Sequence, residues 1–96
     1  MKIIRSDRRH KYYNYGFHFI AEFRMSIVDR EKYSSMLKAV EDVHGPYLIW
    51  HQHDSWGHQA TNDKYKVDHN RKLKRRRIYF KTEQELTFFI LKGNVS

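Results

Sequence analysis

Apolar and polar residues alternate along residues 15–27. Every odd position is apolar or aromatic, and most even positions are polar. A period of two places successive side chains on opposite faces of a strand, so we predict a strand over residues 15–27 with its odd positions on one buried face. The preceding residues 1–14 are basic and show little periodicity. We expect a loose arm there, or an edge strand supplied by Ile3 and Ile4.

Two helices are predicted from helical spacing and from the signals at their ends. The first is expected over residues 29–44, because Asp29 is a residue type that caps helices and Gly45-Pro46 would end one. Its apolar positions recur three or four residues apart, at Tyr33, Met36, Leu37, Val40 and Val43. The second helix is predicted to follow the capping box Thr82–Glu85 and to end at Gly93.

Two further strands are predicted. One covers residues 47–53 and is followed by a polar loop over residues 54–63; Tyr65 and Val67 would extend a hairpin arm. The other covers residues 77–81, and its alternation predicts Ile78 and Phe80 facing the core, with Arg77, Tyr79 and Lys81 facing outward.

The predicted order of elements is strand, helix, strand, strand, helix. This order indicates an α+β fold, a ferredoxin-like β-α-β-β-α sandwich in which two helices cover one face of an antiparallel sheet. We expect a basic N-terminal arm over residues 1–14 and a single domain over residues 15–93. A chain of 96 residues is long enough for one modest core.

The charge of the chain is unevenly distributed. The net charge is +8, yet residues 12–63 carry four basic and seven acidic side chains. Residues 1–11 carry five basic and one acidic side chain, and residues 64–81 carry nine basic and one acidic. Two basic segments joined to a slightly acidic body are typical of a surface that meets a polyanion.

The basic run at residues 71–77 is the strongest functional signal. Lys and Arg neutralise phosphates, and a nearby tyrosine such as Tyr79 can stack on an exposed base. We therefore predict that nucleic acid, RNA or DNA, binds at Arg71, Lys72, Lys74, Arg75, Arg76, Arg77 and Tyr79, helped by Arg5, Arg8, Arg9 and Lys11. Two alternatives stay open: docking on an acidic protein surface, and a solvated strand edge whose charges prevent pairing.

Histidines form a second, weaker signal. His51 and His53 would share one face of a strand and could ligate a metal, with His58 or Asp54 completing the set. Ordinary polar residues beside two tryptophans explain them as well, so no metal or cofactor is assigned. Glu22, Arg24 and His18 would lie on the polar face of the first strand as same-face and cross-strand pairs. Since no catalytic motif is present, we expect a non-enzymatic protein, and a metal-dependent enzyme built on the three histidines is the lesser alternative.

Composition excludes two other classes. The sequence contains no cysteine for a disulfide framework, and no run of about 18 apolar residues for a membrane span. The basic start lacks the apolar segment of a secretory signal. We expect a cytoplasmic protein.

The stretch from Arg77 to Lys92 resembles the ending of many small accessory proteins of large tailed phages. In those proteins an aromatic strand runs into a capped helix that carries an acidic pair and a Phe. The helix closing at Gly45-Pro46 is similar too, so the resemblance covers about residues 15–92. It implies an accessory protein of the host-cell cytoplasm or of the virion, with no catalytic role.

The same junction resembles the third strand of an RRM, a sheet-based RNA-binding domain. In that pattern, the outward positions would be Arg75, Arg77 and Tyr79, and only Tyr79 supplies a ring. The outward positions of the first strand, which are His18, Ile20, Glu22 and Arg24, carry no Phe, Tyr or Trp. The base-stacking platform of an RRM is therefore not met, while binding through charge stays open.

Overall fold

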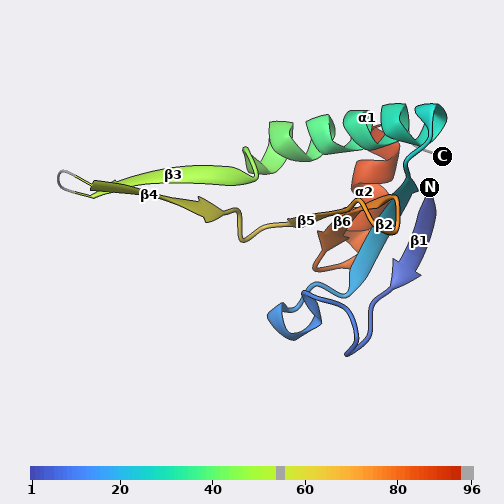
Figure 1. Cartoon of the computed structure of the whole chain (residues 1–96), viewed down its shortest axis with the longest axis horizontal. Helices are drawn as coiled ribbons and strands as arrows, with labels where there is room; N and C mark the ends of the chain where they lie inside the picture. The colour runs from blue at the N-terminus through green and yellow to red at the C-terminus, as the bar shows by residue number, and fades with distance from the viewer. Residues whose placement is uncertain (54–55, 94–96) are drawn as a thin grey trace.

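The computed structural model describes residues 1–53 and 56–93 and shows an α+β fold (Figure 1). A four-stranded antiparallel sheet has the order β1-β2-β6-β5, with β1 at Lys2–Arg5, β2 at Phe19–Arg24, β6 at Arg75–Phe80 and β5 at Lys66–Asn70. Two helices, α1 at Ile27–His44 and α2 at Glu83–Lys92, pack on one face of this sheet. The predicted α+β class, with an antiparallel sheet and two helices, is confirmed.

Both helices begin at a side-chain cap. The Thr82 hydroxyl accepts a hydrogen bond from the Glu85 backbone N–H at 3.1 Å, as the capping box predicts. Helix α1 begins two residues before the predicted start, because Ser26 is its cap and accepts from the Asp29 N–H at 3.2 Å. The Asp29 carboxylate instead accepts from the backbone N–H of Arg24, which holds the pKa of that carboxyl below its usual range.

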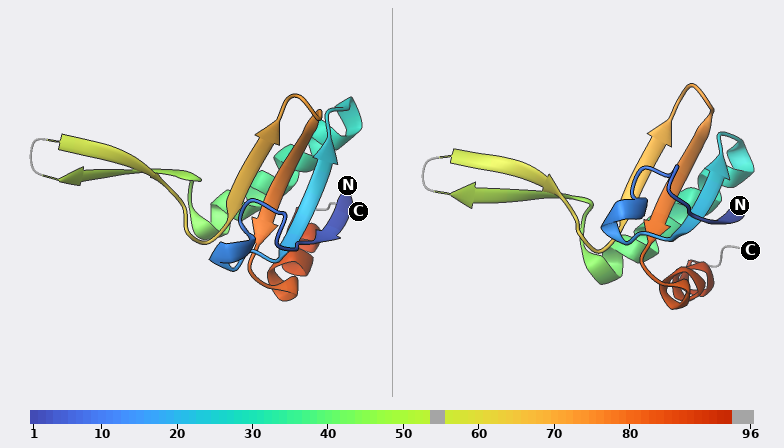
Figure 2. Two further views of the ribbon diagram at one scale, coloured as in Figure 1. Left: turned by 60° about the horizontal axis from the view of Figure 1, so that its bottom comes forward. Right: turned by 90° about the horizontal axis from the view of Figure 1, so that it is seen from below.

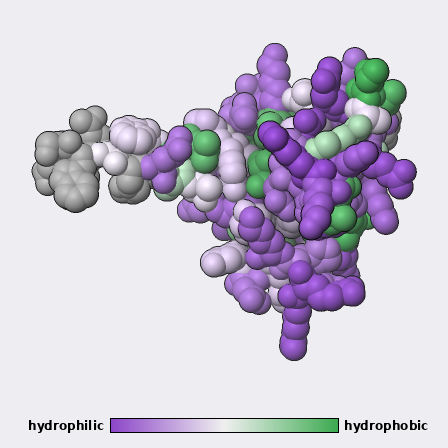
Figure 3. Space-filling model, in the orientation of Figure 1, coloured by the Kyte–Doolittle hydropathy of each residue, from purple (hydrophilic) through white to green (hydrophobic). Residues whose placement is uncertain are grey.

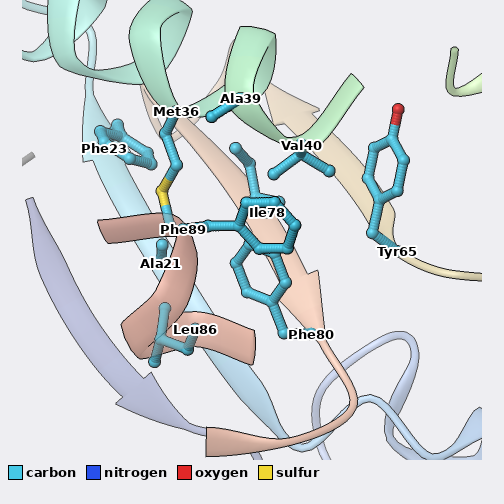
Figure 4. Packing of buried hydrophobic residues seen from close by; sticks show 10 residues of the cluster. All are labelled: Ala21, Phe23, Met36, Ala39, Val40, Tyr65, Ile78, Phe80, Leu86 and Phe89. Carbon is cyan, nitrogen blue, oxygen red and sulfur yellow. The ribbon is translucent and has the colours of Figure 1, made fainter. Parts of the chain in front are cut away.

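The core lies between the helices and the sheet. Ala21 and Ile78 are cross-strand partners in the two central strands, and both are fully buried beneath Met36 and Val40 of α1. Phe89 of α2 stacks on Phe80, with ring centroids 5.5 Å apart (Figure 4). Of the apolar positions predicted for α1, Met36 and Val40 are buried in this layer, and Tyr33 and Leu37 pack against it. Val43 is 48% exposed, so that position of the predicted stripe is wrong.

The strand predicted over residues 15–27 is shorter in the structure. Tyr15 ends the 3₁₀ helix η1 at Tyr13–Tyr15 and is 72% exposed. Gly16 then takes a left-handed conformation with φ +88°, a region that suits glycine, and β2 starts only at Phe19. Phe17 consequently packs on the face opposite the helices, against Ile20 and Tyr79. The central ladder is therefore buried on both faces at this level. At the other end β2 stops at Arg24 because α1 begins at Ile27, so the predicted inward residues Met25 and Ile27 are exposed.

Strand β1 confirms the edge strand suggested by Ile3 and Ile4. It pairs antiparallel with β2, with Lys2 opposite Glu22 and Arg5 opposite Phe19. The first residues of the chain thus belong to the main sheet. Residues 6–18 then cross the face of the sheet that points away from the helices, which we call the open face (Figure 2). They cover the half of this face that contains Ile20 and Tyr79.

The ferredoxin-like strand order is not confirmed. Strand β3, at Leu48–His53, pairs with β4, at Trp56–Thr61, in a separate two-stranded sheet, which we call the ribbon. This ribbon projects from the body of the molecule (Figure 1). The predicted polar loop 54–63 is therefore mostly a strand, because residues 47–53 find their partner in the segment that follows them.

Asn62 fixes the root of the ribbon. It is 2% exposed, and its side-chain amide donates to the carbonyls of His44 and Pro46 at 2.9 and 3.1 Å. Its backbone N–H donates to the Tyr47 carbonyl, so the two chain segments that leave and re-enter the body are joined at this residue. The Tyr65 hydroxyl also reaches this point and donates to the Gly45 carbonyl at 3.0 Å.

No helix in the described part of the chain has the length and apolar character needed to cross a membrane.

The neighbouring residues Phe88 and Phe89 provide a test of the core. Phe89 is 1% exposed and Phe88 is 49% exposed. We expect Phe89→Ala to lower the free energy of unfolding by about 3–5 kcal/mol, because it leaves a cavity between α2 and the sheet. Phe88→Ala is the matched control and should cost less than half as much in urea unfolding monitored by circular dichroism. Equal losses would contradict this packing.

Candidate nucleic-acid interface

The predicted basic run begins in the turn between β5 and β6. The Asn70 side-chain oxygen accepts from the Leu73 N–H at 2.9 Å, and the Lys74 N–H donates to the Arg71 carbonyl. Lys74 takes a left-handed conformation with φ +51°, which reverses the chain into β6. The turn leaves the side chains of Arg71, Lys72 and Lys74 exposed to solvent.

Strand alternation divides the three arginines that follow. Arg76 lies on the helix side, where its guanidinium sits 5.3 Å from the ring centroid of Tyr33. Arg75 and Arg77 lie on the open face, opposite Arg24 and Glu22 of β2. The run of six basic residues therefore does not form one continuous surface.

Glu22 is the common anionic partner of the two open-face arginines. Its Oε1 atom lies 3.6 Å from Arg75 Nη1 and 3.4 Å from Arg77 Nη2. The cross-strand pairing predicted for Glu22 is thus confirmed. The Nε atoms of Arg75 and Arg77 are buried and lack hydrogen-bond partners within the described residues. One carboxylate therefore orients two guanidinium groups and leaves some of their donors unused.

Two of the predicted contact residues are buried. Arg77 is 8% exposed, and Tyr79 is completely buried beneath Tyr12, whose ring centroid lies 5.0 Å away in an edge-to-face arrangement. Burial raises the pKa of Tyr79. Tyr79 does face away from the helices, as predicted, but the N-terminal segment covers its ring. The assignment of Tyr79 as a base-stacking residue is therefore corrected to a packing role.

A groove of about 1030 Å³ occupies the uncovered half of the open face. We call it the basic groove; it is lined by five basic and two acidic side chains, which are Lys2, Arg24, Lys74, Arg75, Arg77, Glu22 and Asp29. Apolar parts of Met1, Ile4, Met25 and Leu73 complete it. Because three strands and a turn supply its cations, the fold concentrates positive charge that is dispersed in the sequence.

Lys2 and Arg24 are absent from the binding residues predicted from the sequence. Lys2 reaches the groove because β1 lies beside β2, and Arg24 because it faces Arg75 across the ladder. The outward position of Arg24 in the first strand was a usable signal. The position of Lys2 depends on which strand β1 pairs with, and no local pattern reveals that.

The basic residues predicted to help from the N-terminal segment, which are Arg5, Arg8, Arg9 and Lys11, do not line the basic groove. Arg5 packs over the Phe19 ring at 5.9 Å, and Lys11 lies 5.3 Å from the centroid of Tyr12. Arg9 is 88% exposed and pairs with Asp7 at 2.8 Å, which holds the pKa of Asp7 well below its usual range. Arg8 is exposed.

Lys11 forms a second basic surface with two lysines from the body, because Lys66 lies over the same Tyr12 ring, whereas Arg5 lies over Phe19 on the helix side. Lys66 and Lys81 both lie within 6 Å of the Phe17 ring centroid. The two predicted basic segments are therefore separated by the length of β6, since the turn adjoins Arg75 and the N-terminal segment adjoins Phe80 (Figure 2). Hydrophilic residues cover most of the body face that Figure 3 shows.

The histidine cluster falls on the ribbon. The backbone register pairs His51 with His58, and His53 with Trp56. The side chains of His51, His53 and His58 lie outside the described part of the structure, as does Asp54, so the metal hypothesis stays a prediction. Among the side chains that are described, no group of three or more His, Asp or Glu residues could hold a metal ion.

Comparison of the chain with protein-family models, with curated proteins and with solved structures finds no match.

Glu22 allows a test of the charge arrangement. We expect Glu22→Gln to lower the free energy of unfolding by at least about 2 kcal/mol, because it leaves the almost buried Arg77 guanidinium without its ion-pair partner. Glu31→Gln, at an exposed position of α1, is the matched control and should change stability by less than about 0.5 kcal/mol. Urea denaturation at neutral pH measures both, and equal effects would show that Glu22 has no special electrostatic role.

Proposed function

We propose that this protein is a small non-enzymatic module that binds nucleic acid by contacting its phosphates in the basic groove and at the β5–β6 turn. The observation that carries the proposal is the groove, where five basic side chains outnumber two acidic ones. Lys and Arg that neutralise phosphates release condensed counterions, and this release supplies most of the affinity of sequence-independent binding.

The arginine pair supports this choice of ligand. A guanidinium presents donors in a planar fork that matches two phosphate oxygens. Arg75 keeps 29% of its side chain exposed while Glu22 orients it from one side. An arginine that is already positioned loses less side-chain entropy when it binds. Exposed Arg24 and Lys74, which also line the groove, would add flexible contacts to neighbouring phosphates.

The groove supports binding without base stacking. None of its lining residues is aromatic, and the nearby Tyr79 ring is covered. Stacking of bases on aromatic rings is the usual second source of affinity for single strands. We therefore propose phosphate contact with little sequence preference. The second basic surface, around Lys11, Lys66 and Lys81, would add affinity only for ligands long enough to span the sheet.

We propose that the protein acts in the cytoplasm of a host cell or in a virion, as the resemblance of residues 77–92 to tailed-phage accessory proteins implies. An acidic protein partner is the alternative that the same charges would serve, and nuclease treatment distinguishes the two.

Paired charge removal tests the proposal. We expect Arg24→Ala combined with Lys74→Ala to weaken binding to labelled single- and double-stranded oligonucleotides of every sequence. The slope of log affinity against log salt should become shallower by about 2, because each of the two side chains neutralises one phosphate and changes the slope by about one unit. Fluorescence anisotropy across a salt series measures affinity and slope together.

The matched control removes the same charge elsewhere. Lys38→Ala combined with Lys92→Ala alters two lysines on the helix side and should leave the slope unchanged. Equal weakening by both double variants would show that only net charge matters and would contradict a groove site. Absence of binding by the unmodified protein at low salt, with a partner retained from lysate after nuclease treatment, would favour the acidic protein.

A further inference from the structure

The ribbon has no structural support beyond its root. Strands β3 and β4 pair with each other, and among the described residues neither packs substantially on a helix or on the main sheet. Figure 1 shows the ribbon extending away from the helices and the main sheet. An isolated two-stranded hairpin is marginally stable in water, and a third or fourth strand usually supplies what it lacks.

The edges of the ribbon also lack the usual protection against pairing. The sequences LIWHQH and WGHQAT contain no Lys, Arg, Asp, Glu or Pro, in a chain with 30 such charged residues. Natural edge strands normally carry charges that prevent pairing with another chain. The edges of the main sheet follow that rule, since β1 carries Lys2 and Arg5 and β5 carries Lys66 and Asp68. The main sheet therefore carries charges at its edges that disfavour pairing with another chain, and the ribbon carries none.

We propose that the ribbon is a self-association element: β3 pairs antiparallel with β3 of a second copy, forming a four-stranded sheet between the two molecules. A two-fold axis suits this arrangement, because antiparallel pairing of identical strands is self-complementary. The inference is independent of the proposed nucleic-acid function.

The choice of β3 over β4 rests on the side chains of the described part. Leu48 and Trp50 are 52% and 63% exposed and are accompanied by Ile49, and such residues favour strand pairing. Strand β4 contains Gly57, whose missing side chain leaves room for the Trp50 ring. A charged residue already lies against the end of β4, where Lys66 Nζ donates to the Thr61 hydroxyl at 2.9 Å.

Electrostatic repulsion favours the ribbon over the body as the contact between two copies. Each copy carries a net charge of +8, so direct contact between bodies would be repulsive. A six-residue strand extends about 20 Å, and antiparallel ribbons place the two bodies at opposite ends of the joint sheet. That separation exceeds the Debye length of about 8 Å at physiological salt, so the repulsion is largely screened.

A pair of lysine substitutions tests the edge directly. Trp50 and Gln59 face each other in the β3–β4 register, and both are exposed. We expect Trp50→Lys to weaken the dimer at least about tenfold, because it adds to β3 the charge that the main sheet edges carry. Gln59→Lys adds the same charge to β4 and is the matched control, expected to leave the dimer intact. Sedimentation equilibrium should report about twice the 11.9 kDa chain mass for the unmodified protein and for the control.

Cross-linking gives a second readout, which introduces no charge at either edge of the ribbon. The chain contains no cysteine, so Trp50→Cys and Gln59→Cys each introduce a single thiol. A short bis-maleimide should cross-link the first variant into a dimer much faster than the second. A monomer at every concentration up to about 100 µM, or a dimer weakened more by Gln59→Lys than by Trp50→Lys, would overturn the proposal.

Discussion

The pairing of β2 with β6 determines the rest of the structure. At Ile20 and Tyr79 this ladder is completely buried from both sides, by the helices on one face and by Tyr12 and Phe17 on the other. A central ladder covered in this way requires the N-terminal segment to cross the open face, and so only half of that face stays accessible. The basic groove occupies that half because the N-terminal segment covers the apolar half.

Local patterns predicted the elements whose partners lie nearby in sequence. The Thr82 cap, the end of α1 at Gly45 and the inward positions Ile78 and Phe80 follow from spacing and end signals that are complete within a few residues. The strand predicted over residues 15–27 was too long, because alternation continues through Tyr15 and Phe17 although Gly16 turns the chain. The prediction of a polar loop at residues 54–63 was wrong because β4 is a strand whose sequence lacks apolar alternation. Its strand conformation depends on hydrogen bonding to β3, which its side chains do not indicate.

The candidate site was predictable in its charge and only partly in its geometry. A run of basic residues can be read directly from the sequence, whereas strand alternation assigns Arg76 to one face and Arg75 to the other. The burial of Tyr79 and the approach of Lys2 both depend on the N-terminal segment, which is far away in sequence and weakly patterned. Long-range pairing therefore decides which cations meet, and it is the part of the fold that local periodicity does not encode.

The bonds at Asn62 divide the molecule into two units of unequal cooperativity. They join the chain at the root of the ribbon, so fraying of β3 and β4 stops there and leaves the helices and main sheet intact. Amide hydrogens of the ribbon would then exchange through local opening, while those of β2 and β6 would exchange only when the whole body unfolds. Insertions of residue pairs into the ribbon would change its reach at almost no cost to the body, which makes its length the most freely adjustable dimension of this protein.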